Sequence, residues 1–224
     1  MPHASDSHAR LLIRTDGWFS RVRAALHEQI PCHRGCCRCC VGPFAITALD
    51  AAELHRGLAS LDEPLRRDIE ARAASQTAAI EVEFPRLRRS PILDDWNDSE
   101  LDTVAERFAD LPCPALGSDG SCRVYPFRPL ACRTMGIPIE EQGLVHGACE
   151  VQTAVPIVRL PRALREEESR LAEREAAEIE AVRRATRAHG EEILLTYGFL
   201  PSASPFRDAA SADPDVPDDA SSPS

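Results

Sequence analysis

The chain has 224 residues, enough for one compact domain with extensions, and 43% of them are hydrophobic, which permits a buried core. Its formal net charge of -10 excludes a general nucleic-acid binder, because such a protein needs a basic surface field. The chain contains no lysine, which also excludes Schiff-base chemistry and a P-loop lysine.

The sequence predicts a cytoplasmic protein with no membrane partner. No stretch approaches the roughly 20 consecutive apolar residues that span a bilayer. The first residues, "MPHASDSHARLLIR", lack the basic-then-apolar order of a secretory signal. A reducing cytosol argues against structural disulfides, and the odd number of cysteines, nine, leaves at least one thiol over in any full pairing.

Apolar periodicity predicts helices in the first half of the chain. The first covers residues 10–30, where Trp18, Val22, Leu26 and Ile30 recur at four-residue steps, and Pro31 ends it. The stretch "ITALDAAELHRGL" predicts a second helix, with Thr47 as N-cap and Asp50 as the acid of a capping box. Two more are predicted over residues 62–83 and in "DSELDTVAERFADL", separated by a linker with Pro85 and Pro91.

The C-terminal part predicts a long charged helix and a disordered tail. The helix covers residues 162–198 and carries a thin apolar stripe of Leu164, Leu171, Ile179 and Val182. It either packs on the domain or extends from it, and a protein partner docking on it is the alternative. From Pro201 onward Ser, Ala, Asp and Pro dominate. We therefore predict a cysteine-cluster domain at 1–160, the charged helix at 161–200 and a disordered tail at 201–224.

Two cysteine-rich loops carry the chemistry. The segment "CHRGCCRCC" places five cysteines in nine positions, and four more lie in the Gly- and Pro-rich stretch 111–149, which offers at most short strands such as "SCRVY". Clustered thiolates repel one another unless a cation lies among them, and zinc and iron–sulfur clusters both accept four thiolates. The predicted metal ligands are Cys32, Cys36, Cys39, Cys40, Cys113, Cys122, Cys132 and Cys149.

The other thiol and the histidines leave alternatives open. Cys37 is either a further ligand, a reserve thiol or a bystander. His33 and His146 lie near cysteines and are candidates for a mixed site, although eight cysteines already exceed what one site needs. The spacing of Cys32, Cys36 and Cys39 also fits radical S-adenosylmethionine enzymes. Those enzymes alternate strands and helices, and the helical flanks of this segment do not.

The cysteine segments are similar to a known family. "CHRGCCRCC", followed by "CPALGSDGSCRVYPFRPLACRTMG", resembles the bacterial YkgJ-like cysteine-cluster proteins, a zinc- or iron-chelating family with a C-x(2,3)-C-x-x-C-C block, then C-P-x-L, then C-x-[IV]-Y-x-x-R-P-x-x-C-R. The match covers about residues 30–150, and Cys37 stands where the family often has glycine. The resemblance implies metal chelation. Flagellin lysine-N-methylases share a similar cysteine set, which implies a methyltransferase only by analogy.

The turn "YPFRP" presents candidate residues around the bound cofactor. Pro126 and Pro129 stiffen it, and four thiolates around a divalent ion leave a negative site. Arg123, Arg128 and Arg133 are therefore predicted to act as counter-charges that donate to sulfur, with Arg128 pairing with a surface carboxylate as the alternative. Tyr125 either lines the site or belongs to the core.

Together these features predict a mostly α fold in which helices frame an irregular, cysteine-rich metal centre. The predicted function is to bind zinc or an iron–sulfur cluster, a [4Fe-4S] cluster being one form. An iron-dependent metalloenzyme or redox sensor, related to the methyltransferases above, is the alternative, because an incompletely ligated iron would favour catalysis. The chain by itself does not decide between these metals or between these functions.

Overall fold

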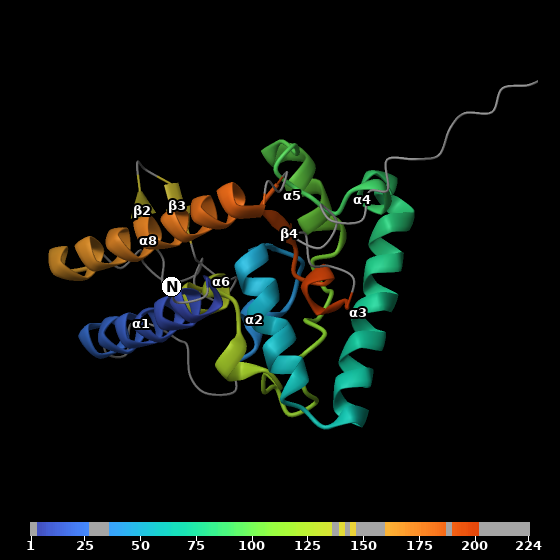
Figure 1. Cartoon of the computed structure of the whole chain (residues 1–224), viewed down its shortest axis with the longest axis horizontal. Helices are drawn as coiled ribbons and strands as arrows, with labels where there is room; N and C mark the ends of the chain where they lie inside the picture. The colour runs from blue at the N-terminus through green and yellow to red at the C-terminus, as the bar shows by residue number, and fades with distance from the viewer. Residues whose placement is uncertain are drawn as a thin grey trace, which may run out of the picture.

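The computed structural model describes residues 4–26, 36–135, 139–141, 144–146, 160–186 and 190–201. The fold is mostly helical, as predicted (Figure 1). The predicted tail lies outside the described residues except for Pro201, and the predicted domain boundaries stay predictions. The longer helices are α1 (Ala4–Ala25), α2 (Ala48–Ala59), α3 (Glu63–Glu83), α5 (Asp98–Arg107) and α8 (Arg162–Thr186).

Short elements connect these helices. They include the helices α4 (Pro85–Arg89) and α6 (Leu130–Thr134) and the single 3₁₀ turns η1 (Arg38–Cys40), η2 (Tyr125–Phe127) and η3 (Tyr197–Phe199). Strand β1 (Ala45–Thr47) pairs antiparallel with β4 (Glu192–Leu194), and β2 (Ile139–Glu141) pairs antiparallel with β3 (Leu144–His146). None of the helices in the described part of the chain is long and apolar enough to cross a bilayer.

Helix α2 occupies the middle of the molecule. The pair α1 and α8 lies on one side of it and the long helix α3 on the other, with η3 between α2 and α3 (Figure 1). The capping box predicted at its start is confirmed: Thr47 Oγ1 accepts the N–H of Asp50, and the Asp50 carboxylate accepts the N–H of Thr47. This capping box satisfies backbone donors that the first turn of a helix leaves unpaired.

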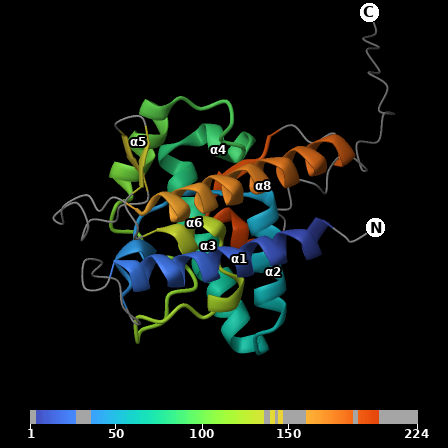
Figure 2. The ribbon, with the colours of Figure 1, turned by 90° about the vertical axis from the view of Figure 1, so that its left-hand side faces the viewer.

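Helices α1 and α8 run antiparallel along one side of the molecule (Figure 2). At one end Trp18 donates from Nε1 to the Leu164 carbonyl oxygen at 2.9 Å, and at the other Ser7 donates to Glu178 at 2.6 Å. Trp18, Val22 and Leu26 form a small apolar cluster with Leu160. The apolar face predicted for the first helix is therefore confirmed at these positions, whereas Ile30 lies outside the described residues.

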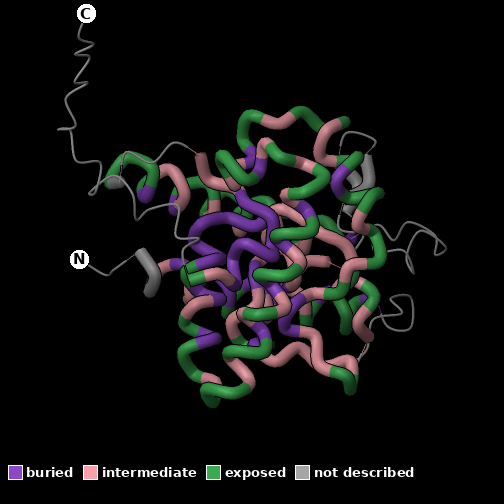
Figure 3. Tube along the Cα trace, turned by 90° about the vertical axis from the view of Figure 1, so that its right-hand side faces the viewer, coloured by how far each residue is buried: buried purple, intermediate pink, exposed green. Residues whose placement is uncertain are grey.

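The main core lies between α2, α3 and the β1–β4 pair (Figure 3). It includes Leu54, Ile69 and Ile80 from the helices and Ile193 and Phe199 from the C-terminal segment, none more than 1% exposed. The segment after α8 therefore belongs to the same packed unit as the middle of the chain.

Three predicted element boundaries are wrong. The first helix already begins at Ala4, because its first turn packs through His8 and Leu11 against the rest of the domain. The predicted helix over 162–198 does not reach its end: Gly190 has φ +100°, and residues 192–194 form a strand paired with β1. In the predicted linker, Pro85 starts α4, a position where the missing N–H of proline costs nothing.

Candidate metal centre

The two cysteine-rich loops meet through their backbones. The N–H of Cys113 donates to the carbonyl oxygen of Cys40 at 2.7 Å, and the N–H of Gly42 donates to the carbonyl oxygen of Leu111 at 2.8 Å. Val41 and Pro112 form an isolated antiparallel bridge between these two bonds. The short ladder fixes the register between the loops, so Cys40 and Cys113 lie side by side.

The first loop is folded tightly before this ladder begins. The N–H of Cys40 donates to the carbonyl oxygen of Cys37 at 2.9 Å, which closes the turn η1. Cys36, Cys37, Cys39 and Cys40 are all partly buried. A 3₁₀ turn has about three residues per turn, so it presents neighbouring thiols in different directions instead of as one stripe.

The second loop is a compact hairpin-like turn followed by two helical turns. Leu116 and Cys122 form an isolated bridge, and the predicted strand "SCRVY" is limited to this bridge because the chain turns into η2 at Tyr125. Cys132 then follows on α6. The close approach of η2 to α2 depends on Gly57, since a Cβ there would lie 2.8 Å from the Cβ of Phe127.

Burial and mutual repulsion raise the pKa of three thiols in the second loop. Burial raises the pKa of Cys113 to about 12, and the neighbouring Cys122 contributes to this rise. The pKa of Cys132 is well above its usual value, first because the thiol is buried and then because Cys113, Cys122, the Asp50 carboxylate and Cys39 lie near it. Burial also raises the pKa of Cys122, and Cys39 adds to the effect. Forming several thiolates here is therefore costly unless a cation compensates for them.

Cys39 and Cys40 form a hydrogen-bonded thiol pair. The side-chain hydrogen bond from Cys40 lowers the pKa of Cys39 to about 7, and the guanidinium of Arg128 adds to this effect. The same bond raises the pKa of Cys40, with burial and the nearby Cys113 and Cys132 as further causes. Cys39 therefore forms a thiolate more readily than Cys40, which suits it to bind a metal.

Of the three predicted cofactor-binding residues, Tyr125 and Arg128 lie at the turn η2 and Arg133 lies on α6. Arg128 donates to Asp16 at 2.7 Å and lies over the ring of Tyr125, 3.9 Å from its centroid. Its charge favours the thiolate of Cys122 as well as that of Cys39. Tyr125 is 59% exposed and is therefore not a core residue. Arg128 pairs with a carboxylate, which was the alternative, and it also acts electrostatically on two thiols.

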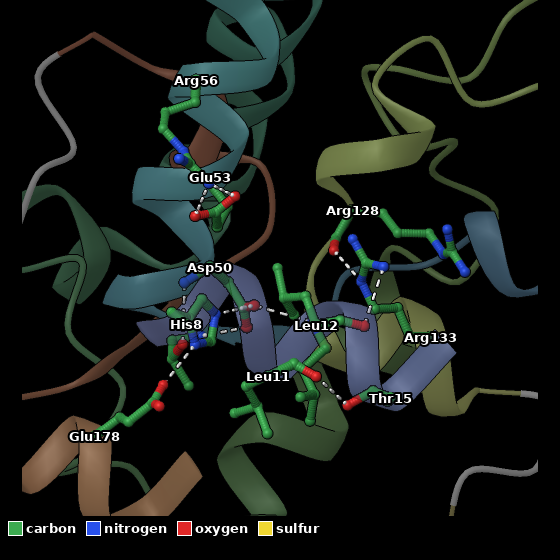
Figure 4. A network of polar contacts seen from close by, with 12 residues as sticks. His8, Leu11, Leu12, Thr15, Asp50, Glu53, Arg56, Arg128, Arg133 and Glu178 are labelled. Carbon is green, nitrogen blue, oxygen red and sulfur yellow. Dashed lines mark hydrogen bonds and ion pairs between the residues drawn. The ribbon is translucent and has the colours of Figure 1, made fainter. Parts of the chain in front are cut away.

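Arg133 anchors the turn to α1. Its side chain is 2% exposed and donates to Asp16 and to the carbonyl oxygen of Pro126 at 2.7 Å. It also donates to the carbonyl oxygen of Arg128 at 2.9 Å (Figure 4). All its hydrogen bonds with described residues end on oxygen atoms. Burial lowers the pKa of Arg133, while the carboxylate of Asp16 opposes this shift and keeps the guanidinium paired.

Sequence reasoning missed two residues that hold this region together. Asp16 pairs with Arg128 and Arg133, and His8 contacts Asp50. His8 is fully buried and therefore needs partners, but nothing near it in sequence indicates which ones. The signal that could have identified His8 is its position on the apolar face of the first helix, near Leu11 and Leu12.

Several predicted site residues lie outside the described residues, namely Cys32, Cys149 and His33, and the side chain of His146 is not described either. The seven described cysteines are free thiols. In the part of the chain that the structure describes, no three His, Cys, Asp or Glu side chains already converge as in a metal site. The donor chemistry nevertheless fits zinc or iron, because sulfur is the soft ligand that both metals accept.

The described residues also line a cavity that contains no cysteine in its wall. It has a volume of about 860 Å³ and lies between α1 and α8, lined by residues such as Arg10, Arg14, Arg170 and Arg174.

Comparison with known proteins identifies the domain that contains both loops. Residues 31–150 match the model of the CxxCxxCC family, described as "Putative zinc- or iron-chelating domain". No curated protein and no solved structure matches the chain. The matched segment includes all of the predicted ligands and more than half of the chain. The chain belongs to the CxxCxxCC family of zinc- or iron-chelating domains.

Proposed function

We propose that this protein binds a zinc ion or an iron–sulfur cluster through thiols contributed by both cysteine-rich loops. The observation that carries the proposal is the hydrogen-bonded ladder that joins the loops at Cys40 and Cys113. It gathers thiols that raise one another's pKa, and a metal ion removes that cost by displacing their protons. We assign the ligands to Cys36, Cys39, Cys40, Cys113, Cys122 and Cys132 among the described residues, and Cys32 and Cys149 to the same set.

Arg128 acts as a counter-charge to the metal-bound thiolates. Four thiolates and one divalent cation carry a net negative charge, and the positive charge of Arg128 already favours the thiolates of Cys39 and Cys122. Its pairing with Asp16 and Tyr125 keeps the guanidinium at this position. Arg133 has a different role, because it fixes the turn that carries Arg128.

A reducing compartment, the cytoplasm, is where we expect the protein to act. Thiols that share a small volume form disulfides readily in an oxidising environment, and these would compete with metal binding. The low pKa of Cys39 makes it the thiol most exposed to this competition.

The metal decides between a chelating protein and an enzyme. Zinc has no redox chemistry and points to a structural or metal-handling role, whereas iron with an incompletely ligated corner would suit an enzyme or a redox sensor. A methyltransferase would also need to bind a methyl donor. We place the chelating role first, because the family match and the contact between the two loops both support metal binding by thiols.

The test is anaerobic purification of the full chain with elemental analysis and an absorption spectrum. A colourless protein with zinc supports a closed thiolate site, and a brown protein with iron and a broad visible band supports an iron–sulfur cluster. Protein that binds neither metal, when all its thiols are reduced and each metal is supplied, would overturn the proposal. For the enzyme alternative, iron-loaded protein is titrated with S-adenosylmethionine by calorimetry, and heat of binding would favour it.

A further inference from the structure

One buried carboxylate connects the core helices to the helix that carries Cys132. Asp50 is 2% exposed. Its Oδ2 accepts the N–H of Thr47 at 3.4 Å, which completes the capping box of α2. Its Oδ1 accepts the N–H of Leu130, the first residue of α6, at 2.9 Å. The same side chain therefore closes one helix and supports the start of another.

The bond to Leu130 matters because α6 has few other supports. The helix has only five residues, so it cannot be stable by itself, and its first N–H groups have no partner within the helix. Cys132 lies on its first turn. Within the described residues, the other firm attachment of this segment is Arg133, whose guanidinium bonds the preceding turn and Asp16. Arg133 thus fixes the turn before α6, whereas Asp50 binds the first N–H of the helix itself.

The carboxylate is itself held by His8. The imidazole is fully buried between α1, α2 and α8, with Nε2 3.2 Å from Asp50 Oδ1 and Nδ1 3.5 Å from Glu178 Oε2 (Figure 4). Both ring nitrogens face carboxylates, so a protonated imidazole can donate to both. Burial opposes protonation, but the bond and charge of Asp50, then Glu178 and Glu175, outweigh it and raise the pKa of His8.

We propose that Asp50 is a positioning residue of the metal centre, which sets the place of Cys132 by holding the first N–H of α6, and that His8 keeps its carboxylate in that position. The inference rests on the proposed function, in which Cys132 is a ligand. Asp50, which is not part of the cysteine pattern, would then influence how many thiolates bind the metal ion.

Cobalt(II) is the probe for the test, because its thiolate charge-transfer absorption reports how many sulfurs bind it. The reduced full chain is titrated with Co²⁺, first as wild type and then as Asp50→Ala. We expect about 10-fold weaker binding in the variant, the lower end of the effect of removing a residue that orients a ligand. We also expect the absorption per bound ion to fall by about a quarter, as for the loss of one of four thiolates.

Two matched variants separate positioning from general stability. Thr47→Ala removes the other half of the same capping box but leaves the Asp50 carboxylate and its bond to Leu130, so it should destabilise α2 without changing Co²⁺ binding. Leu130→Pro removes the N–H that Asp50 accepts and keeps the Asp50 carboxylate, although it also replaces the partly buried leucine side chain; at the first helical position proline is tolerated. It should reproduce the cobalt result of Asp50→Ala, and it replaces that variant if Asp50→Ala does not fold.

The outcomes are distinct. Wild-type protein that shows no thiolate–cobalt absorption and binds neither zinc nor iron would overturn the proposed function itself. If Asp50→Ala and Leu130→Pro both show the same absorption per bound Co²⁺ as the wild type, only the positioning role of Asp50 is overturned. The same loss in Thr47→Ala would also overturn it, because the effect would then come from the end of α2.

Discussion

The N–H of Cys113 donates to the carbonyl oxygen of Cys40 at 2.7 Å. This bond joins two cysteines from loops that are separated in sequence by the helices α2, α3, α4 and α5. Those helices return the chain to its starting point, so the cost of bringing the thiols together is met by the folding of the core and not by the metal alone. The fold therefore brings the two cysteine-rich loops together, which makes the following variants informative.

Replacing a ligand should release the metal, whereas replacing Cys37 should not. About 10–16 kcal/mol of binding free energy is shared by the ligands of a structural zinc site, so losing one of four costs about 3 kcal/mol, roughly 100-fold in affinity. We expect this loss for Cys36→Ser and for Cys132→Ser, measured by competition with a chromogenic chelator. Cys37→Ser is the control with a smaller effect. Equal losses in all three would show that our division of the first loop into ligands and non-ligands is wrong.

The buried His8 should make stability depend on pH. Because the folded-state pKa of His8 is raised above its usual value of about 6.5, its contribution is fully present below pH 6.5 and is lost as the pH rises through the folded-state pKa. Glu175, whose pKa is raised to about 7 by burial, acts in the same direction at slightly lower pH. His8→Asn should therefore cost about 2 kcal/mol at pH 6, the value of a hydrogen bond to a charged group.

Urea unfolding of wild type and His8→Asn at pH 6 and pH 8.5 measures this difference in stability. The pH dependence of metal binding is common to both proteins, so it cancels in the comparison. The gap between the two free energies of unfolding should narrow at the higher pH. A gap that widens as the pH rises would mean that His8 is neutral in the folded protein.

Removing Asp16 should destabilise the protein more than removing an exposed partner of arginine. Asp16→Ala leaves the buried guanidinium of Arg133 without its carboxylate, and we expect a loss of about 2 kcal/mol, less than for a fully buried pair because Asp16 is partly exposed. Asp119→Ala breaks an exposed pair with Arg123 and should cost much less, because solvent screens the charges of that pair. Thermal and urea unfolding compare the two, and similar losses would contradict a special role for the Asp16 network.

The C-terminal core residue Phe199 should matter more than the whole tail. Phe199 is 1% exposed in the main core, so Phe199→Ala should cost about 3–5 kcal/mol. Removing residues 201–224 should leave both stability and metal content unchanged, as expected from a composition that predicts disorder. Loss of metal in the truncated chain would show that the tail takes part in the centre.

Features that depend on residues close together in the sequence could be predicted, whereas features that depend on contacts between distant segments could not. The capping box of Thr47 and Asp50 was predictable because both residues lie within one turn, and the same logic describes Asn97 and Glu100 at the start of α5. The strand β4 was not, since "EILL" suits a helix as well as a strand. These residues form a strand because they pair with β1, which lies far away in the sequence.

The candidate site shows the same division. The spacing of the cysteines predicted a metal centre because cysteine side chains are themselves metal ligands. The partners of Arg133 and His8 could not be predicted, because each depends on how α1 packs against segments far along the chain. Asp50 could be recognised as a cap but not as the support of α6, since one side chain makes both contacts only in the folded protein.

The pairing of β1 with β4 also has a consequence for biosynthesis. A ribosome releases residues 45–47 long before it has made residues 192–194, and the core that contains Ile193 and Phe199 cannot close until then. The nascent polypeptide therefore carries each thiol uncovered from its synthesis until the C-terminal segment has been made. That interval is when an incoming metal ion or an oxidant has the freest access to them.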